Sequence, residues 1–237
     1  MNVDLKEQSN NFELKLPTID NLREAGVHFG HKKGKWHPKM KPYLSGDVDA
    51  THIIDLEQTL PMLELAINFL KGEMANNKVV LFVGTGLPHR AIVKEVAEKL
   101  EMPYVSEHWV GGLLTNFKTI NKRLEYFRDL EKKKEAGELE KYTKKEQLGF
   151  NKEIEKLRKN FSGIKKMMKL PDILLVINGK ENLLAIKEAK KIKIPVIGLC
   201  DTNIDPSLFD YCIPANDDAI SSVGLILETI AENIKNK

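Results

Sequence analysis

Short apolar runs alternate with longer amphipathic stretches along most of the chain. These runs are rich in β-branched residues and lie at 52–54 (HII), 79–83 (VVLFV), 104–106 (YVS), 173–177 (ILLVI), 195–199 (PVIGL) and 211–213 (YCI). The longer runs are apolar at nearly every position, which is typical of strands buried on both faces. The pattern therefore predicts an α/β fold in which helices cover a parallel sheet through right-handed crossovers.

Capping residues predict where two of the helices begin. Asn216 can cap the amphipathic stretch 216–234, which would place Asp217 and Asp218 in the positive first turn of that helix. Near the N-terminus, the sequence TIDN (18–21) opens a shorter predicted helix that ends close to Gly26.

Residues 117–168 interrupt the alternation, because they contain no strand pattern. Apolar residues recur there at helical spacing, at Ile120, Leu124, Phe127 and Leu130 and again at Ile154, Leu157, Phe161, Ile164 and Met168. Gly137 marks a break between the two series, and Thr143 with Glu146 matches a capping box. The segment 117–168 is therefore predicted to be a basic antiparallel coiled-coil hairpin inserted into an α/β domain made of 1–116 and 169–237.

The charge is distributed unevenly, although the formal net charge of the 237 residues is only +3. Residues 118–170 hold 17 Lys and Arg against 9 Asp and Glu, whereas 200–237 hold 2 against 7. This asymmetry indicates one face suited to a polyanion.

Several classes of protein are disfavoured by composition. No apolar run approaches a membrane span, and the first 20 residues match neither a secretory signal nor a transit peptide, so we expect a cytoplasmic protein. Cys200 and Cys212 are the only cysteines and form no CxxC pair, which fits a reducing compartment.

Residues 25–46 (AGVHFGHKKGKWHPKMKPYLSG) contain three histidines and five lysines but no acidic residue. The lysines can meet phosphates, and Trp36 and Tyr43 offer rings that can stack on a base. The glycines and prolines favour an extended loop. A metal site that joins His31 to Asp201 or Asp217 stays open, although the lysines would repel a cation.

Catalysis and nucleotide binding receive little support. The chain has no GxSxG or HExxH motif, so we assign no catalytic residue, cofactor or metal ligand. Gly84 and Gly86 (VGTG) resemble the start of a dinucleotide fingerprint without its third glycine, which leaves a nucleotide-binding enzyme as the alternative. A protein-binding scaffold is a third possibility.

Several segments, in this order, resemble the bacterial-type ribosomal protein S2 family: AGVHFGHKKGKWHPKMKPY, HIIDLEQT, WVGGLLTNFKTI, PDILLVI, KEAKKIKIPVIGLCDTNIDP and IPANDDAI. The resemblance runs from about Leu22 to Ile234. It implies a flavodoxin-like sheet with a protruding coiled-coil hairpin, and a structural protein of the small ribosomal subunit without enzymatic activity. It also implies partners: small-subunit rRNA near the head–body junction and neighbouring ribosomal proteins including S1, with no membrane and no small-molecule substrate.

By this resemblance, rRNA-binding residues are expected in three segments. They are His31, Lys32, Lys33, Lys35, Trp36, His37, Lys39, Lys41, Trp109, Thr115, Asn116, Lys118, Lys122 and Arg123. Five positions depart from the family pattern: Lys35 and His108 replace Arg, His37 replaces Asn, Gly86 replaces Lys, and Ala215 replaces Gly. Lysine in place of arginine removes a possible bidentate phosphate contact at position 35.

Overall fold

The centre of the protein is a five-stranded parallel sheet with strand order β5-β4-β6-β7-β8. The computed structural model describes residues 14–235, so the N-terminal part of the segment examined for a signal or transit peptide, 1–13, lies outside the described residues. The strands are β4 (Val80–Val83), β5 (Tyr104–Val105), β6 (Ile173–Val176), β7 (Val196–Cys200) and β8 (Tyr211–Pro214). Counted from β4, this order is that of flavodoxin-like folds, so the predicted fold class is confirmed.

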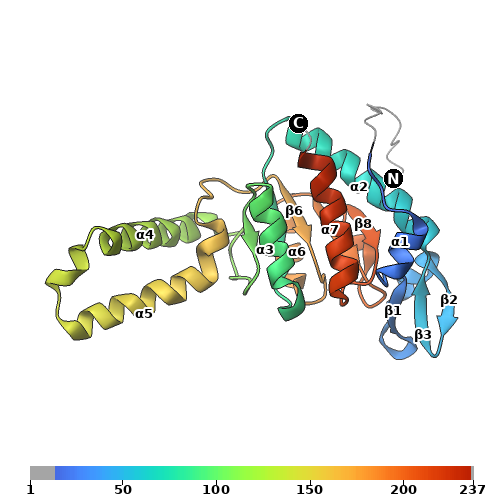
Figure 1. Ribbon diagram of the computed structural model, residues 1–237, viewed down its shortest axis with the longest axis horizontal. Coiled ribbons are helices and arrows are strands. Elements are labelled where there is room, and N and C mark those ends of the chain that lie inside the picture. Colours follow the sequence, from blue (N-terminus) through green and yellow to red (C-terminus); the bar gives the residue numbers. More distant parts are fainter. Residues whose placement is uncertain (1–13, 236–237) are drawn as a thin grey trace.

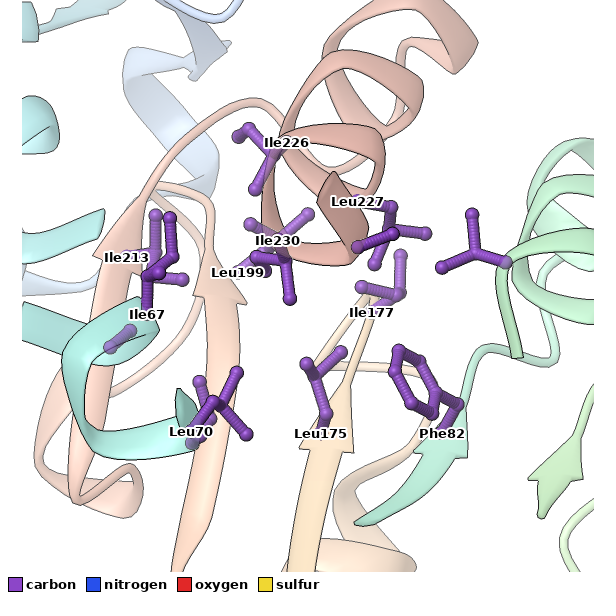
Figure 2. Packing of buried hydrophobic residues seen from close by; sticks show 14 of the residues in the cluster. Ile67, Leu70, Phe82, Leu175, Ile177, Leu199, Ile213, Ile226, Leu227 and Ile230 are labelled. Atoms are coloured by element: carbon purple, nitrogen blue, oxygen red, sulfur yellow. The ribbon is translucent and has the colours of Figure 1, made fainter. Parts of the chain in front are cut away.

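Helices cover both faces of the sheet (Figure 1). One face packs against α2 (Leu56–Ala75), α3 (Arg90–Lys99) and α7 (Ile220–Lys235), and Figure 2 shows its buried Leu, Ile and Phe side chains. The other face packs against α6 (Leu183–Lys191). Neighbouring residues of one strand serve opposite faces: Phe82 belongs to the first core and Leu81 to the second. Burial on both faces explains why these runs have no polar positions.

A second, antiparallel sheet of three strands lies at one end of the molecule (Figure 1). It contains β1 (Phe29–Lys32), β3 (Thr51–Ile54) and β2 (Leu44–Val48), in this order. The prediction of an extended loop over 25–46 was therefore wrong, since strands β1 and β2 flank two 3-10 turns, Lys33–Lys35 and Pro38–Tyr43. The HII run also pairs in this sheet and not in the parallel one. We call residues 29–54 the basic lobe.

The region after β5 forms two helices that contact one another and project from the body (Figure 1). They are α4 (Phe117–Glu135) and α5 (Lys144–Phe161), and we call them with their connecting turn the hairpin. Gly137 has a φ of 73°, and Thr143 and Glu146 form the predicted capping box. The second helix ends earlier than predicted, because a 3-10 turn (Ser162–Ile164) follows it and leaves Met168 68% exposed.

A buried carboxylate ties the two hairpin helices together. Glu131 of α4 is only 8% exposed and accepts hydrogen bonds from Arg158 of α5, at 2.9 Å from Nη2 and 3.3 Å from Nε. It also forms an ion pair with Lys165, whose backbone carbonyl accepts a 2.7 Å hydrogen bond from Arg128. These contacts lower the pKa of Glu131 in spite of its burial.

Two helix starts can be compared with the predictions. The short helix α1 (Ile19–Glu24) begins where expected, and Thr18 and Asn21 form a capping box at its start. The last helix begins at Ile220, so Asp217 and Asp218 precede it and do not lie in its first turn. Asn216 instead accepts hydrogen bonds from the N–H groups of Asp218 and Ala219. No helix within residues 14–235 is long and apolar enough to cross a membrane.

Candidate nucleic-acid interface

The basic lobe is held against the sheet by the turn that follows β7. Thr202 accepts a 2.9 Å hydrogen bond from the His31 N–H at its hydroxyl and a 2.7 Å bond from the His37 N–H at its carbonyl. A Cβ added at Gly30 would lie 2.4 Å from the Thr202 methyl group, so only glycine permits this close approach. Met40 of the lobe is fully buried and belongs to the same apolar cluster as one face of the sheet. The lysines of the lobe are therefore displayed on an ordered surface.

All five lysines of the lobe are exposed, but two of them already have acidic partners. Lys33 forms a 2.8 Å ion pair with Asp47, and Lys39 a 2.7 Å ion pair with Asp205. The remaining three, Lys32, Lys35 and Lys41, form no ion pair within residues 14–235. Residues 25–46 contain no acid, but Asp47 of β2 and Asp205 after β7 lie beside two of their lysines. The lysines therefore form two classes, paired and unpaired.

The pairing between Lys39 and the turn after β7 has a clear electrostatic signature. The Lys39 ammonium, the Ser207 hydroxyl and the Ser207 N–H all donate to Asp205. These contacts, led by Lys39, lower the pKa of Asp205 to about 2. The carboxylate is therefore ionised at neutral pH and compensates most of the charge of its lysine.

The rings of the lobe are partly covered. Trp36 is half-buried, and its ring lies 5.0 Å from that of His52, tilted by 50°. His37 is also half-buried, and its Nδ1 accepts a hydrogen bond from the Lys39 N–H. Both rings are therefore only partly accessible to a nucleic acid.

A second basic cluster lies at the start of the hairpin. The side chains of Thr115, Asn116, Lys118, Lys122 and Arg123 are all exposed. No ion pair joins the three cations to any acid in the described part of the chain. This second cluster and the basic lobe lie on opposite sides of the α/β body (Figure 1).

Trp109 differs from the other expected contact residues because it is only 6% exposed. Its Nε1 donates a 3.1 Å hydrogen bond to Glu188 of α6, which also receives hydrogen bonds from Gly112, Leu114 and Thr115. Trp109 therefore packs inside the molecule. Glu188 was not predicted from the sequence, although an acid beside Ala185 and Ala189 on the buried face of the helix was a usable signal.

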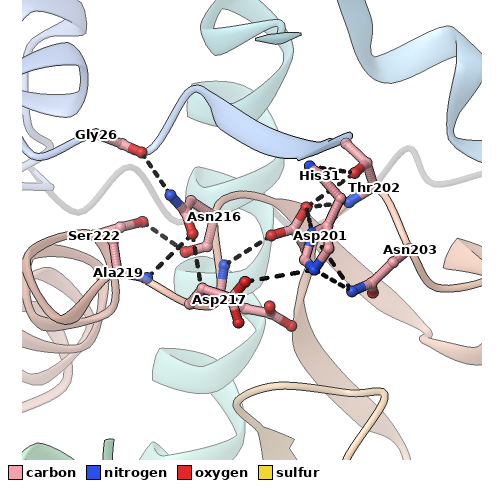
Figure 3. Close-up of polar contacts among 10 residues, drawn as sticks. Gly26, His31, Asp201, Thr202, Asn203, Asn216, Asp217, Ala219 and Ser222 are labelled. Carbon is pink, nitrogen blue, oxygen red and sulfur yellow. Dashed lines mark hydrogen bonds and ion pairs between the residues drawn. The ribbon is translucent and has the colours of Figure 1, made fainter. Parts of the chain in front are cut away.

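A group of acids meets His31 at the carboxyl ends of β7 and β8 (Figure 3). His31 Nδ1 lies 3.1 Å from Asp201, and Nε2 lies 3.4 Å from Asp218 and 2.8 Å from the Asn203 amide. The hydrogen bond to Asp201 is the main reason that the pKa of His31 is raised. Burial, aided by Asp201, raises the pKa of the neighbouring Asp217 well above its usual range.

The same group could hold a divalent cation. One ligand atom from each of His31, Asp201 and Asp218 lies within 4.8 Å of the others, and imidazole with carboxylates is a common donor set for zinc. The sequence pointed to Asp201 or Asp217, whereas the structure brings Asp218 to the imidazole. Asp217 is 1% exposed and faces inward.

The glycines of the VGTG sequence have packing roles. A Cβ at Gly84 would lie 2.7 Å from Val93, and one at Gly86 would lie 3.0 Å from the Glu181 carboxylate. In this fold, ligands bind beyond the carboxyl ends of the paired strands β4 and β6, where the strand order reverses, and Glu181 places a negative charge there beside Gly86. This charge would repel the phosphates of a nucleotide, which counts against the alternative of a nucleotide-binding enzyme.

Comparison with known proteins gives one consistent result. A family model described as ribosomal protein S2 matches residues 22–236. The small ribosomal subunit protein uS2 of Coprothermobacter proteolyticus is 47% identical over 217 residues, which cover 92% of this chain and 81% of that protein. The uS2c protein of Rhodomonas salina is 46% identical over 92% of this chain and 89% of its own length. The uS2 protein of Hahella chejuensis is 46% identical over 91% and 85%.

Proposed function

The chain belongs to the ribosomal protein S2 family of small-ribosomal-subunit proteins, which are not enzymes, and from this premise we propose that it binds small-subunit rRNA through the basic lobe and the start of the hairpin. The main support for the proposal is that some exposed cations are paired with an acid whereas others have no acidic partner in the described chain. Lys32, Lys35 and Lys41 in the lobe, and three further cations in α4, are exposed without acidic partners in the described chain. Unpaired cations gain most from a phosphate, because no internal ion pair has to be broken.

The mechanism is neutralisation of phosphates combined with a fixed surface shape. Each cation that meets a phosphate releases a counterion, so the affinity falls as the salt concentration rises. If all six unpaired cations contact phosphates, a plot of log K against log salt should have a slope of roughly −4 to −5. Because the two clusters lie on opposite sides of the body, we propose that they contact separate segments of rRNA.

The paired and unpaired lysines offer a direct test. We expect K32Q/K35Q/K41Q to weaken binding to rRNA or to depleted small subunits and to make the salt slope shallower by about 2 to 3. The control K33Q/K39Q also removes exposed lysines, but their charges are already compensated by Asp47 and Asp205. It should therefore change the slope by less than half as much. Equal effects of the two variants, or a wild-type slope near zero, would refute the electrostatic mechanism.

The hairpin is also expected to be a separate unit of the fold. We propose that 117–168 is an inserted unit and that 1–116 with 169–237 forms the remaining domain. Its support is that α4 and α5 contact one another and project from the α/β body (Figure 1). Replacing 117–168 by a short linker should leave a folded α/β body, which circular dichroism and thermal unfolding would detect.

Partners and location follow from the family resemblance alone. We propose that the protein acts in cytoplasmic ribosomes near the head–body junction of the small subunit and helps to dock ribosomal protein S1. Small subunits reconstituted without this chain should then bind less S1, and the purified chain should restore that binding. Normal S1 occupancy in its absence would exclude the docking role without affecting the rRNA-binding proposal.

A further inference from the structure

Glu188 occupies an anion-binding nest built by the segment between β5 and α4. Its side chain is 6% exposed, and all of its hydrogen-bond donors come from residues 109–115. Oε1 accepts from Trp109 Nε1 at 3.1 Å and from the Gly112 N–H at 2.8 Å. Oε2 accepts from the Leu114 N–H at 3.1 Å, the Thr115 N–H at 3.2 Å and the Thr115 hydroxyl at 3.1 Å. One carboxylate thus orders the whole segment.

The nest keeps this carboxylate ionised. Burial by itself raises the pKa of Glu188, but the hydrogen bonds from Gly112, Trp109 and the following N–H groups outweigh it and lower the pKa. No lysine or arginine within residues 14–235 forms an ion pair with Glu188, so the loop donors alone stabilise its charge. Gly112 makes the geometry possible, since its φ of 85° turns the backbone N–H toward the carboxylate.

The loop leads directly into the second basic cluster. Thr115 is its last nest residue, Asn116 precedes α4, and Lys118 lies in the first turn of that helix. Asn116 and Lys118 therefore project from a backbone whose path is set one residue earlier by Glu188. The same carboxylate links α6 of the body to the start of the hairpin.

We propose that Glu188 is a positioning residue that holds the 109–115 loop and the first turn of α4 in the orientation needed for rRNA. The proposal rests on the proposed rRNA binding. Glu188 is too buried to touch RNA, and its negative charge would repel phosphates if it were exposed. Glu188 acts through the five polar groups that donate hydrogen bonds to it. Without these bonds the loop would be disordered and the five groups would compete for phosphate.

The test compares E188Q with E228Q in the full-length protein. The amide side chain introduced by E188Q would keep the size of the carboxylate, but its NH₂ group would face backbone N–H donors and lose at least two acceptor contacts. E228Q makes the same chemical change at an exposed position of α7. Hydrogen exchange at the Gly112, Leu114 and Thr115 amides reports on the nest, and rRNA affinity across a salt series reports on binding.

We expect E188Q to speed exchange at those three amides, to lower rRNA affinity about tenfold or more, and to make the salt slope shallower by about 1 to 2 as cluster contacts are lost. A residue with only a general structural role would reduce the folded fraction and leave the slope of the folded protein unchanged. E228Q should alter neither readout. If E188Q fails to fold, T115V and W109F each remove one donor to the same carboxylate and should give smaller changes in the same direction.

Two results would overturn the positioning role. One is fast exchange in the loop with wild-type affinity and slope, and the other is exchange that stays slow in E188Q and in both donor variants. A wild-type protein without salt-dependent rRNA binding is a different outcome, because it refutes the proposed function together with any positioning role for it. Normal wild-type binding with unaffected variants refutes the positioning role alone.

Discussion

The buried carboxylate of the hairpin provides the sharpest stability prediction. In E131Q, the side chain keeps its shape but loses its charge, so Arg158 and Lys165 lose an ionic partner. Removing one member of a fully buried ion pair costs about 3–5 kcal/mol, because the other charge is stranded. Here the partner side chains are 49% and 38% exposed, so both cations can regain water. We therefore expect a loss of only about 1–2 kcal/mol, the value of hydrogen bonds to a charged group after resolvation.

The pH dependence of the stability loss in E131Q shows whether the charge of Glu131 causes it. The folded-state pKa of Glu131 lies below its ordinary value of 4.5, so its stabilising effect is complete above pH 4.5 and disappears as the pH falls through the folded pKa. Protonated Glu131 resembles glutamine, and the difference between wild type and E131Q should shrink toward zero in acid. Native-state hydrogen exchange at the α4 and α5 amides, corrected for intrinsic rates, would measure the difference between about pH 7 and about pH 3.

A matched control uses the same arginine. Glu155 forms a 2.8 Å ion pair with Arg158, but its side chain is 64% exposed. We expect E155Q to cost less than about 0.5 kcal/mol, since exposed pairs contribute little. The reasoning would be refuted if E131Q and E155Q had equal effects, or if the effect of E131Q were the same at both pH values.

Two further predictions concern the body. In G198A, the new Cβ would lie 2.2 Å from the Phe209 ring, and we expect urea denaturation to show a loss of stability of about 2–3 kcal/mol. In the control G224A, the Cβ meets nothing within 4 Å in α7, so the stability should be unchanged or rise by up to about 1 kcal/mol. A similar loss in both variants would contradict the packing argument. The raised pKa of His31 means that its protonated form stabilises the fold fully below pH 6.5 and that this effect is lost as the pH rises through the folded pKa. The stability difference between wild type and H31Q should thus be largest in mild acid and fall by about pH 9, and an increase with pH would count against the ion pair with Asp201.

The parallel sheet was predicted well because a strand buried on both faces has a continuous apolar run in its own sequence. Continuous apolar runs located β4, β6, β7 and β8, and capping chemistry located α1 and α5. The basic lobe was predicted poorly because β1 and β2 are short and largely polar, and only the HII run of β3 left an apolar signal. Its order depends on Thr202, which lies 171 residues from His31 and leaves no pattern in either segment.

The difference between local patterns and long-range contacts also explains which site residues could be predicted from the sequence. Exposed cations at the start of α4 could be read from the sequence, because local helical spacing decides their exposure. The partners that modify the site could not be read, since Asp205 lies 166 residues from Lys39 and Glu188 lies 79 residues from Trp109. Trp109 was expected to contact rRNA from the family resemblance, and the sequence could not show its burial, because an aromatic ring beside glycines is equally compatible with exposure and with burial.

The hairpin also has a consequence for how the chain folds. It interrupts the connection between β5 and β6, two strands that both pair with β4. An unfolded connection of roughly 70 residues must close before β6 can pair, whereas a preformed hairpin shortens the flexible part to about 20 residues. The closure entropy then falls by about 1 kcal/mol, or roughly fivefold in rate if closure limits folding. Early formation of α4 and α5 would therefore act as an internal guide that brings β6 to the sheet.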